Sequence, residues 1–307
     1  MKKYLFPAIA IAIGGIVSCG KDYNPNGVHP DKNNDIATLI AALAPQPKTV
    51  TINAATGGSF NGNSGTRFVF APNSFRTSTG AIVTGDVQVR VTEFLKKADI
   101  LYSGVLPISD GEPLLSGGEM LVEATQGGQD VQMAPGKPFK ANMPMQGTKA
   151  NGMQLFIAEK NGGVVNWKPV DTAVGGFVFT DGDTIGISSI KVNTYCNADR
   201  FMSFPDYQDF TITINMNGQT YIKDSMKLYT VYDEYNGVWP NRGYNAVGND
   251  YRENHVPNIP VHFVAMIESK GKFYGGITGA TPSNGGKYII DMEETTPVAF
   301  KTKLMDL

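Results

Sequence analysis

Short stretches in which apolar and polar residues alternate recur along most of the chain and predict β-strands. In the clearest, at 86–93, Val87, Val89 and Val91 face one way and the residues between them face the other. Turns rich in glycine and asparagine separate the stretches, which is typical of antiparallel sheets. Further strands are predicted at 48–52, 66–70, 119–124, 139–143, 154–158, 166–170, 177–180, 185–192, 210–214, 227–232, 261–267, 272–277 and 286–291.

This spacing of strands predicts an all-β protein with two antiparallel β-sandwich domains in tandem. We expect the first sandwich at 48–147 and connecting β-hairpins with a junction at 148–200. A second sandwich, immunoglobulin-like or fibronectin-like, is expected at 201–307. The 307 residues suffice for two domains of ordinary size. A brief helix is predicted at 35–43, with Asp35 as its N-cap.

The beginning of the chain has the pattern of an export signal. Two lysines precede an apolar run at 4–17, and Cys19 follows it closely. The run is too short to span a bilayer comfortably as a permanent helix. We therefore expect a signal peptide at 1–18 and a polar, lipidated tether at 19–47, rich in proline, glycine and asparagine before its short helix.

The four residues that close this run, Ile-Val-Ser-Cys at 16–19, resemble the bacterial lipobox. The resemblance implies cleavage before Cys19, diacylglycerol on its sulfur and a further acyl chain such as palmitate on the new amino terminus. Several chains on one residue bind a membrane far more strongly than a single chain. Gly20 stands where an aspartate would retain a lipoprotein at the inner membrane, so the resemblance implies the outer membrane, on either its periplasmic or its external face. The alternative is an ordinary secretory signal that happens to end in cysteine.

A second resemblance follows from the order of three motifs. Gly-Gly-Ser-Phe at 57–60, Ala-Pro-Asn-Ser-Phe at 71–75 and Thr-Gly-Asp-Val at 84–87 together resemble a ZU-type domain. That β-sandwich module occurs in ankyrins, netrin receptors and tight-junction scaffolds. The stretch at 93–119 is similar to the version found in Bacteroidetes lipoproteins, and the likeness covers about 50–145. Apart from the resemblance, the glycine pairs in these motifs predict close backbone approach or positive φ.

Some ZU-type domains cut themselves at His-Phe-Ser, where the serine hydroxyl attacks its own preceding carbonyl. This chain has His262-Phe263-Val264, outside the matched region and without a nucleophile. Self-cleavage is therefore not expected. His262 is predicted to be a packed or strand-edge histidine.

Charge and cysteine content narrow the function classes. The formal net charge is −2, and loss of the two signal-peptide lysines leaves 24 basic against 28 acidic residues, or −4. A nucleic-acid partner is not expected, since it requires a concentrated basic face. With Cys19 lipidated, Cys196 has no partner for a disulfide and is predicted to be a buried small hydrophobe rather than a reactive thiol.

No motif for a metal, a cofactor or a catalytic group is found. The spacing of cysteine and histidine does not fit zinc, and Asp-Gly-Asp at 181–183 lacks the later acidic ligands of a calcium loop, so a turn is expected there. Glu93, Glu112, Glu119 and Glu123 are close in sequence, but a glycosidase requires two carboxylates at a defined distance in a cleft. We expect no catalytic residue, no metal and no cofactor.

Two local predictions concern polar residues later in the chain. Asp199 is expected to pair with the neighbouring Arg200 rather than to act in catalysis. A loop is expected at 233–257, with aromatic and basic side chains among asparagines and glycines. Such side chains can stack on sugar rings or bind a protein partner. The favoured alternative is that they cover the end of the second sandwich, because a long loop needs packing of its own. The candidate binding residues are Tyr235, Trp239, Arg242, Tyr244 and Tyr251.

Together these patterns predict a protein that is held to the membrane through a lipid on Cys19 and is not an enzyme. We expect a protein-interaction or structural module of the cell envelope, with a protein or glycan partner. The alternative is a glycan-binding accessory lipoprotein that uses the loop at 233–257. A hydrolase of unrecognised type is the third hypothesis.

Overall fold

The computed structural model describes residues 36–145, 151–161, 164–173, 175–204, 206–222, 225–241 and 248–307. These residues form mainly β-strands in several sheets, so the all-β class predicted from the sequence is confirmed. The expected signal peptide at 1–18 and Cys19 lie outside the described residues. Among the described helices, none has the length and apolarity needed to cross a membrane.

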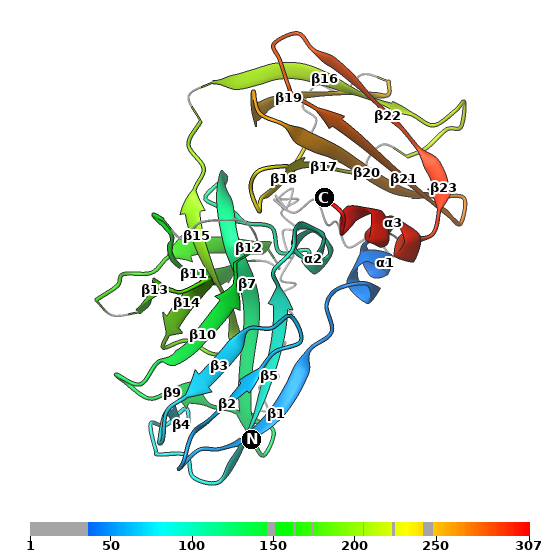
Figure 1. The fold of residues 1–307 in the computed structure, drawn as a ribbon. Coiled ribbons are helices and arrows are strands. Elements are labelled where there is room, and N and C mark those ends of the chain that lie inside the picture. Colours follow the sequence, from blue (N-terminus) through cyan, green and yellow to red (C-terminus); the bar gives the residue numbers. More distant parts are fainter. Residues whose placement is uncertain are drawn as a thin grey trace, which may run out of the picture.

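The first half of the chain forms two main sheets (Figure 1). One runs in the order β1 (Lys48–Asn53), β5 (Asp86–Phe94), β7 (Glu112–Gln126), β15 (Thr194–Phe201), β11 (Gln154–Asn161), β12 (Val164–Pro169). The other runs in the order β13 (Gly176–Asp181), β14 (Thr184–Ser189), β10 (Phe139–Pro144), β3 (Arg67–Phe70), β2 (Gly58–Asn61). The short strands β6 (Ile108–Ser109) and β8 (Gln129–Asp130) pair with β7, and β4 (Phe75–Arg76) pairs with β9 (Gln132–Met133).

These two sheets share one hydrophobic core, to which alternate residues of their strands contribute. Val87, Val89 and Val91 are fully buried, as the alternation at 86–93 predicts. They belong to the same cluster as Phe68 and Phe139 of the opposing sheet. The strict period of two in β5 therefore determines which side of this strand is covered.

Residues 148–200, expected to be connecting hairpins and a junction, supply strands to both of these sheets. The segment expected to bridge two domains forms β15, which lies between β7 and β11. Cys196 and Ala198 on β15 are buried in the shared core. Burial raises the pKa of the Cys196 thiol to about 12, which agrees with the prediction of an unreactive, buried side chain.

The second half of the chain forms two further sheets. One runs in the order β19 (Asp250–Pro257), β16 (Tyr207–Asn215), β22 (Lys287–Asp291), and the β16–β22 pairing is parallel. The other runs in the order β18 (Val238–Pro240), β17 (Lys227–Tyr232), β20 (Val261–Ser269), β21 (Lys272–Ala280), β23 (Glu293–Thr295). Residues of both sheets meet in a second hydrophobic cluster, for example Phe210 of β16 and Phe263 of β20, whose rings lie 5.3 Å apart. The number of sandwiches and their immunoglobulin-like character stay predictions.

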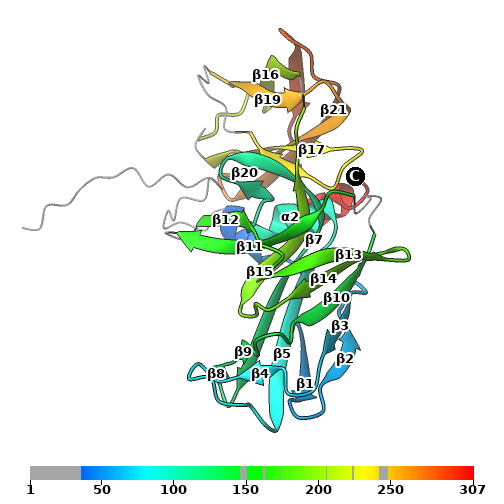
Figure 2. The ribbon, with the colours of Figure 1, turned by 90° about the vertical axis from the view of Figure 1, so that its left-hand side faces the viewer.

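Three short helices lie together between the two β regions (Figures 1 and 2): α1 (Ile36–Ala42), α2 (Lys97–Ser103) and α3 (Pro297–Leu304). Helix α2 follows β5 of the first sheet, yet its buried Ile100, Leu101 and Tyr102 belong to the second hydrophobic cluster. The Lys97 side chain donates hydrogen bonds of 2.8 Å to the backbone carbonyls of Asp233 and Leu307. Helix α2 therefore joins the two halves by both apolar and polar contacts.

The brief helix expected at 35–43 is confirmed as α1, while Asp35, its expected N-cap, lies outside the described residues. Its Ile36 and Ile40 are buried in the second cluster, and the Lys301 side chain of α3 donates to the Leu43 carbonyl at 2.6 Å. The last part of the expected tether at 19–47 is therefore folded against the body. Helix α3 was not predicted. It begins with Thr296 as N-cap, whose hydroxyl accepts a hydrogen bond from the Ala299 N–H.

Gly57 shows why a glycine opens the first motif. Its φ is +69°, and a Cβ added there would lie 2.3 Å from the Phe70 carbonyl oxygen. Gly136 has the same φ of +69°, but a Cβ added there would meet nothing within 4 Å. Both positions therefore have the same backbone strain for a residue with a side chain, but only Gly57 also has a steric clash. Comparing them measures the clash alone.

We expect Gly57→Ala to destabilise the protein well beyond Gly136→Ala. The left-handed conformation alone costs an alanine about 1–2 kcal/mol at either position. The close approach to Phe70 should add about 1–3 kcal/mol at Gly57 only. Urea unfolding of both variants measures the difference, and equal losses would contradict the steric explanation.

Candidate functional site

The loop predicted at 233–257 contains two strands, β18 and β19, and the structure describes only part of what lies between them. Tyr235 lies in the turn before β18, Trp239 in β18 and Tyr251 in β19. Arg242 and Tyr244 lie outside the described residues. Strand β19 was missed because Glu253 stands at an inward position and interrupts its apolar alternation.

The described aromatic side chains of this region are enclosed by protein. Trp239 is 4% exposed and Tyr251 7% exposed. The Tyr251 hydroxyl lies 3.4 Å from that of Tyr221, and the half-buried Tyr235 packs against Phe204 with ring centroids 6.2 Å apart. Such packing is what we expect of rings that close the end of the β-structure, the favoured alternative at the sequence level.

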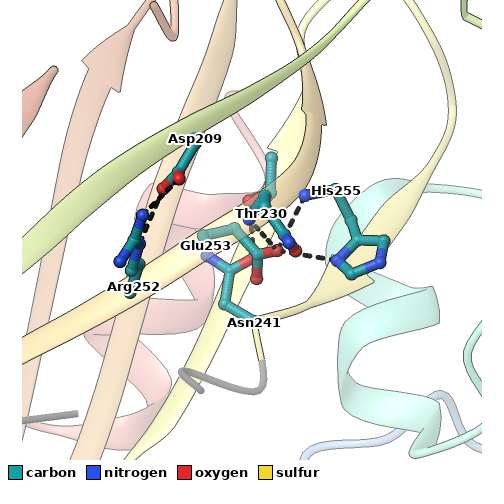
Figure 3. A network of polar contacts seen from close by, with 7 residues as sticks. Asp209, Thr230, Asn241, Arg252, Glu253 and His255 are labelled. Carbon is teal, nitrogen blue, oxygen red and sulfur yellow. Dashed lines mark hydrogen bonds and ion pairs between the residues drawn. The ribbon is translucent and has the colours of Figure 1, made fainter. Parts of the chain in front are cut away.

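A buried carboxylate organises the polar contacts beside these rings (Figure 3). The pairing of β16 with β19 shifts between Gln208 and Phe210, so β19 carries a bulge after Glu253. The Glu253 Oε1 accepts hydrogen bonds from the backbone N–H groups of Asn254 at 2.8 Å and His255 at 2.9 Å. Glu253 therefore stabilises the backbone of the bulge that follows it.

The His255 imidazole lies on the outer side of this carboxylate. Its Nδ1 is 3.4 Å from Glu253 Oε1, and its side chain is 62% exposed. The imidazole also lies over Trp239, with ring centroids 6.0 Å apart. In the same view, the Thr230 hydroxyl donates to Asn241 Oδ1 at 2.8 Å in a buried contact (Figure 3). The bulge thus presents one accessible imidazole beside a buried carboxylate.

Two more pairs of charged side chains lie on this half of the molecule. Arg252 Nε donates to Asp209 Oδ1 at 2.8 Å, and this hydrogen bonding lowers the pKa of the Asp209 carboxyl (Figure 3). Both side chains are about half exposed, so the pair contributes little to stability. His262 Nδ1 lies 2.6 Å from Asp233 Oδ1, where β20 begins. His262 is thus a half-buried strand histidine with a carboxylate partner.

The arrangement of these groups favours structural roles. An imidazole beside a carboxylate can transfer protons. However, Glu253 is occupied by the backbone of its bulge, and Asp233 belongs to the turn to which Lys97 binds. Within the part of the chain that the structure describes, no three histidine, cysteine or acidic side chains gather as metal ligands.

Glu93 and Glu119, two of the four glutamates that are close in sequence, lie on opposite faces of their sheet. Glu93 is buried and accepts hydrogen bonds from the backbone N–H groups of Ser64 at 2.8 Å and Thr66 at 3.0 Å. Glu119 is also buried, but it pairs across the sheet with Phe94, the residue after Glu93, and therefore faces the opposite side.

The predicted pairing of Asp199 with Arg200 is wrong. Asp199 is fully buried, and its Oδ2 accepts a hydrogen bond of 2.6 Å from the Asn197 side chain. Arg200 donates to the Asn151 carbonyl at 3.5 Å. Successive residues of a strand point to opposite faces, so the two side chains of β15 diverge.

Comparison with known proteins adds no relationship to these observations. No protein-family model matches the chain, and no curated protein is significantly similar to it.

We expect Glu253→Ala to destabilise the protein and Glu253→Gln to be nearly neutral. Alanine removes the acceptor of two backbone N–H groups, at a cost of about 1–3 kcal/mol. Glutamine retains a carbonyl oxygen in the same place and should stay within about 1 kcal/mol of the parent. Urea unfolding provides the measurement. An equal loss in both variants would show that the charge, and not the acceptor, is required.

Proposed function

We propose that this protein is a lipid-anchored, non-enzymatic interaction or structural module of the bacterial cell envelope. The ZU-type and Bacteroidetes lipoprotein resemblances and the outer-membrane location belong to the same proposal. They rest on the motifs at 16–19 and 57–119.

The observation that carries this proposal is that the described aromatic and acidic side chains of the candidate sites make contacts within the protein itself. Trp239 and Tyr251 are buried, and Glu93 and Glu253 bind backbone N–H groups. At the same time, α2 joins the two β regions through one hydrophobic cluster. Because these aromatic and acidic groups stabilise the fold, they are not available to a substrate. This supports a role in which the protein surface binds a partner rather than a role in catalysis.

The position of α1 suits a protein held above a membrane. Helix α1 packs between the two β regions, beside α2. Ile36 lies seventeen positions after Cys19 along the chain (36 − 19). A chain of this length spans at most about 60 Å. A lipid on Cys19 would therefore hold the body close to the bilayer while leaving most of its surface free for a partner.

The body also offers apolar side chains for such a partner. Phe177 on β13 is 47% exposed, and Ile289 on β22 is 56% exposed. Both strands lie at the edges of their sheets. Exposed apolar residues on edge strands are where another protein can add contacts. The burial of Trp239 and Tyr251 makes the glycan-binding alternative depend on other residues of that loop.

We expect Cys19→Ala to release the protein from the membrane without changing its folded body. The variant lacks the sulfur that carries diacylglycerol, and the several acyl chains are what make the attachment stable. Labelling with radioactive palmitate and membrane fractionation measure the loss, and circular dichroism of the purified variant checks the fold. Parental membrane retention by Cys19→Ala would refute lipid anchoring at this residue.

We expect photo-crosslinking residues at Phe177 or Ile289 of the lipidated protein to yield discrete protein adducts in intact cells. Thr180 and Lys287 are exposed polar positions on the same two strands and serve as controls, with weaker adducts expected. A glycan array with the purified protein is the companion measurement. Sugar binding without protein adducts would replace the interaction module by the glycan-binding alternative.

A further inference from the structure

Strand β7 contains a bulge that changes which of its side chains lie together. In its pairing with β15, Glu119 stands opposite Asn197, whereas Ser116 stands opposite Asp199. Three steps along β7 thus match two steps along β15, and the extra residue falls at Gly117–Gly118. Ser116 and Glu119 would face opposite sides of a regular strand, but the bulge places both on the face of Asn197 and Asp199.

The two glycines permit this bulge. Gly118 has a φ of +135°. A Cβ added at Gly117 would lie 2.8 Å from side-chain atoms of Ile185 and Met153. Close approach and positive φ, which we expect of glycine pairs in this part of the chain, are both present here. They allow polar side chains to come together and do not form a turn.

The four polar residues brought together in this way are fully buried. Ser116, Glu119, Asn197 and Asp199 are each 0% exposed. The alternate residues of the same strands, such as Met120 and Cys196, lie in the core shared by the two sheets of the first half. The cluster therefore occupies the opposite face of the β7–β15 pair.

This cluster contains more oxygen acceptors than the described residues satisfy. Both carboxylate oxygens of Glu119, Oδ1 of Asp199 and Oδ1 of Asn197 accept no hydrogen bond from the described residues. The Asn197 Nδ2 donates to Asp199 Oδ2 at 2.6 Å, which fixes its amide group inside the cluster. Asn197 is therefore a neutral, buried side chain whose unpartnered oxygen belongs to the same cluster as the carboxylates.

The charges of the two carboxylates are not balanced by nearby basic side chains. None of the ion pairs between described residues includes Glu119 or Asp199. Burial raises the pKa of both groups, and the charge of Asp199 raises that of Glu119 further. The side chains of Ser116 and Asn197 partly oppose this rise at Asp199. Buried carboxylates in such surroundings either hold protons or bind a cation.

We propose that Glu119, Asn197 and Asp199 form an internal binding site for a hard divalent cation, with Ca²⁺ as the best match. One divalent ion balances both negative charges and takes all four unpartnered oxygens as ligands. The ligands are two carboxylates and one amide oxygen, a set that Ca²⁺ accepts, with Glu119 bidentate. Mg²⁺ is less suitable because it demands near-ideal octahedral geometry and gives up its own waters reluctantly, whereas Ca²⁺ accepts an irregular set of oxygens and completes its shell with backbone carbonyls or waters.

The site lies where the two halves of the molecule are joined. The backbone N–H of Ser116, beside the bulge, donates to the Asn236 carbonyl at 2.9 Å. The Asn236 side chain in turn donates to the Leu95 carbonyl at 3.1 Å. A cation between β7 and β15 would therefore stabilise the strand onto which the 233–237 turn docks. Because its ligands are buried, the ion is taken up while the chain folds.

The test uses the full chain, purified in detergent, unfolded in urea with a chelator and refolded with either Ca²⁺ or EDTA. We expect one Ca²⁺ per chain by elemental analysis after dialysis, and a melting temperature several degrees higher than in EDTA, since a ligand that binds only the folded state stabilises it. Refolding with Mg²⁺ alone should yield little bound metal.

The variants Glu119→Gln and Asp199→Asn should each lose the bound Ca²⁺ and its effect on melting, while folding in EDTA. The two are independent, so either one suffices if the other does not fold. Asp183→Asn, in the exposed turn between β13 and β14, is the matched control and should keep both. Absence of stoichiometric Ca²⁺ from the parent, with equal melting in EDTA, would show that the carboxyls hold protons and would overturn the proposal. Retention of Ca²⁺ by both ligand variants would also overturn it.

Discussion

The insertion of α2 into the hydrophobic cluster of the second half is the contact on which the architecture depends. Helix α2 follows β5 in the chain. Its side chains Ile100, Leu101 and Tyr102 are buried in the same hydrophobic cluster as residues of β17 and β20. Helices α1 and α3 both contact α2, so early and late segments of the chain meet at this helix. Because these apolar surfaces would be exposed if the halves separated, their burial favours a single body over two independent modules.

Buried carboxylates in this protein are used in two ways. Glu93 and Glu253 each accept two backbone N–H groups of a neighbouring turn or bulge, which satisfies donors that the irregular backbone leaves outside the sheets. Glu119 and Asp199 differ, because the described residues leave their acceptor oxygens partly unsatisfied. Burying a polar group without hydrogen-bond partners costs free energy. Glu119 and Asp199 are therefore the pair at which we propose a bound ligand.

The proposal of an interaction or structural module rests on how a few side chains are used. Among the described residues that first suggested binding or catalysis, Trp239 and Tyr251 are buried and Glu93 accepts hydrogen bonds from backbone N–H groups. Apolar side chains remain exposed on edge strands, where they are available to a partner. An internal cation would strengthen the pairing of β7 with β15, next to the turn that joins the two halves, and so contribute to stability rather than to chemistry.

The alternation of apolar residues predicted many of the strands, the buried face of β5 and the all-β class, because a period of two can be recognised within a few residues. Glycine pairs likewise marked positions of close approach at Gly57 and Gly117. Only the tertiary structure decided that β15 lies between β7 and β11, that α2 belongs to the other half, and that Glu119 meets Asp199. These three results depend on contacts between residues far apart in sequence and on one bulge that reverses the side-chain alternation, and no local pattern contains that information.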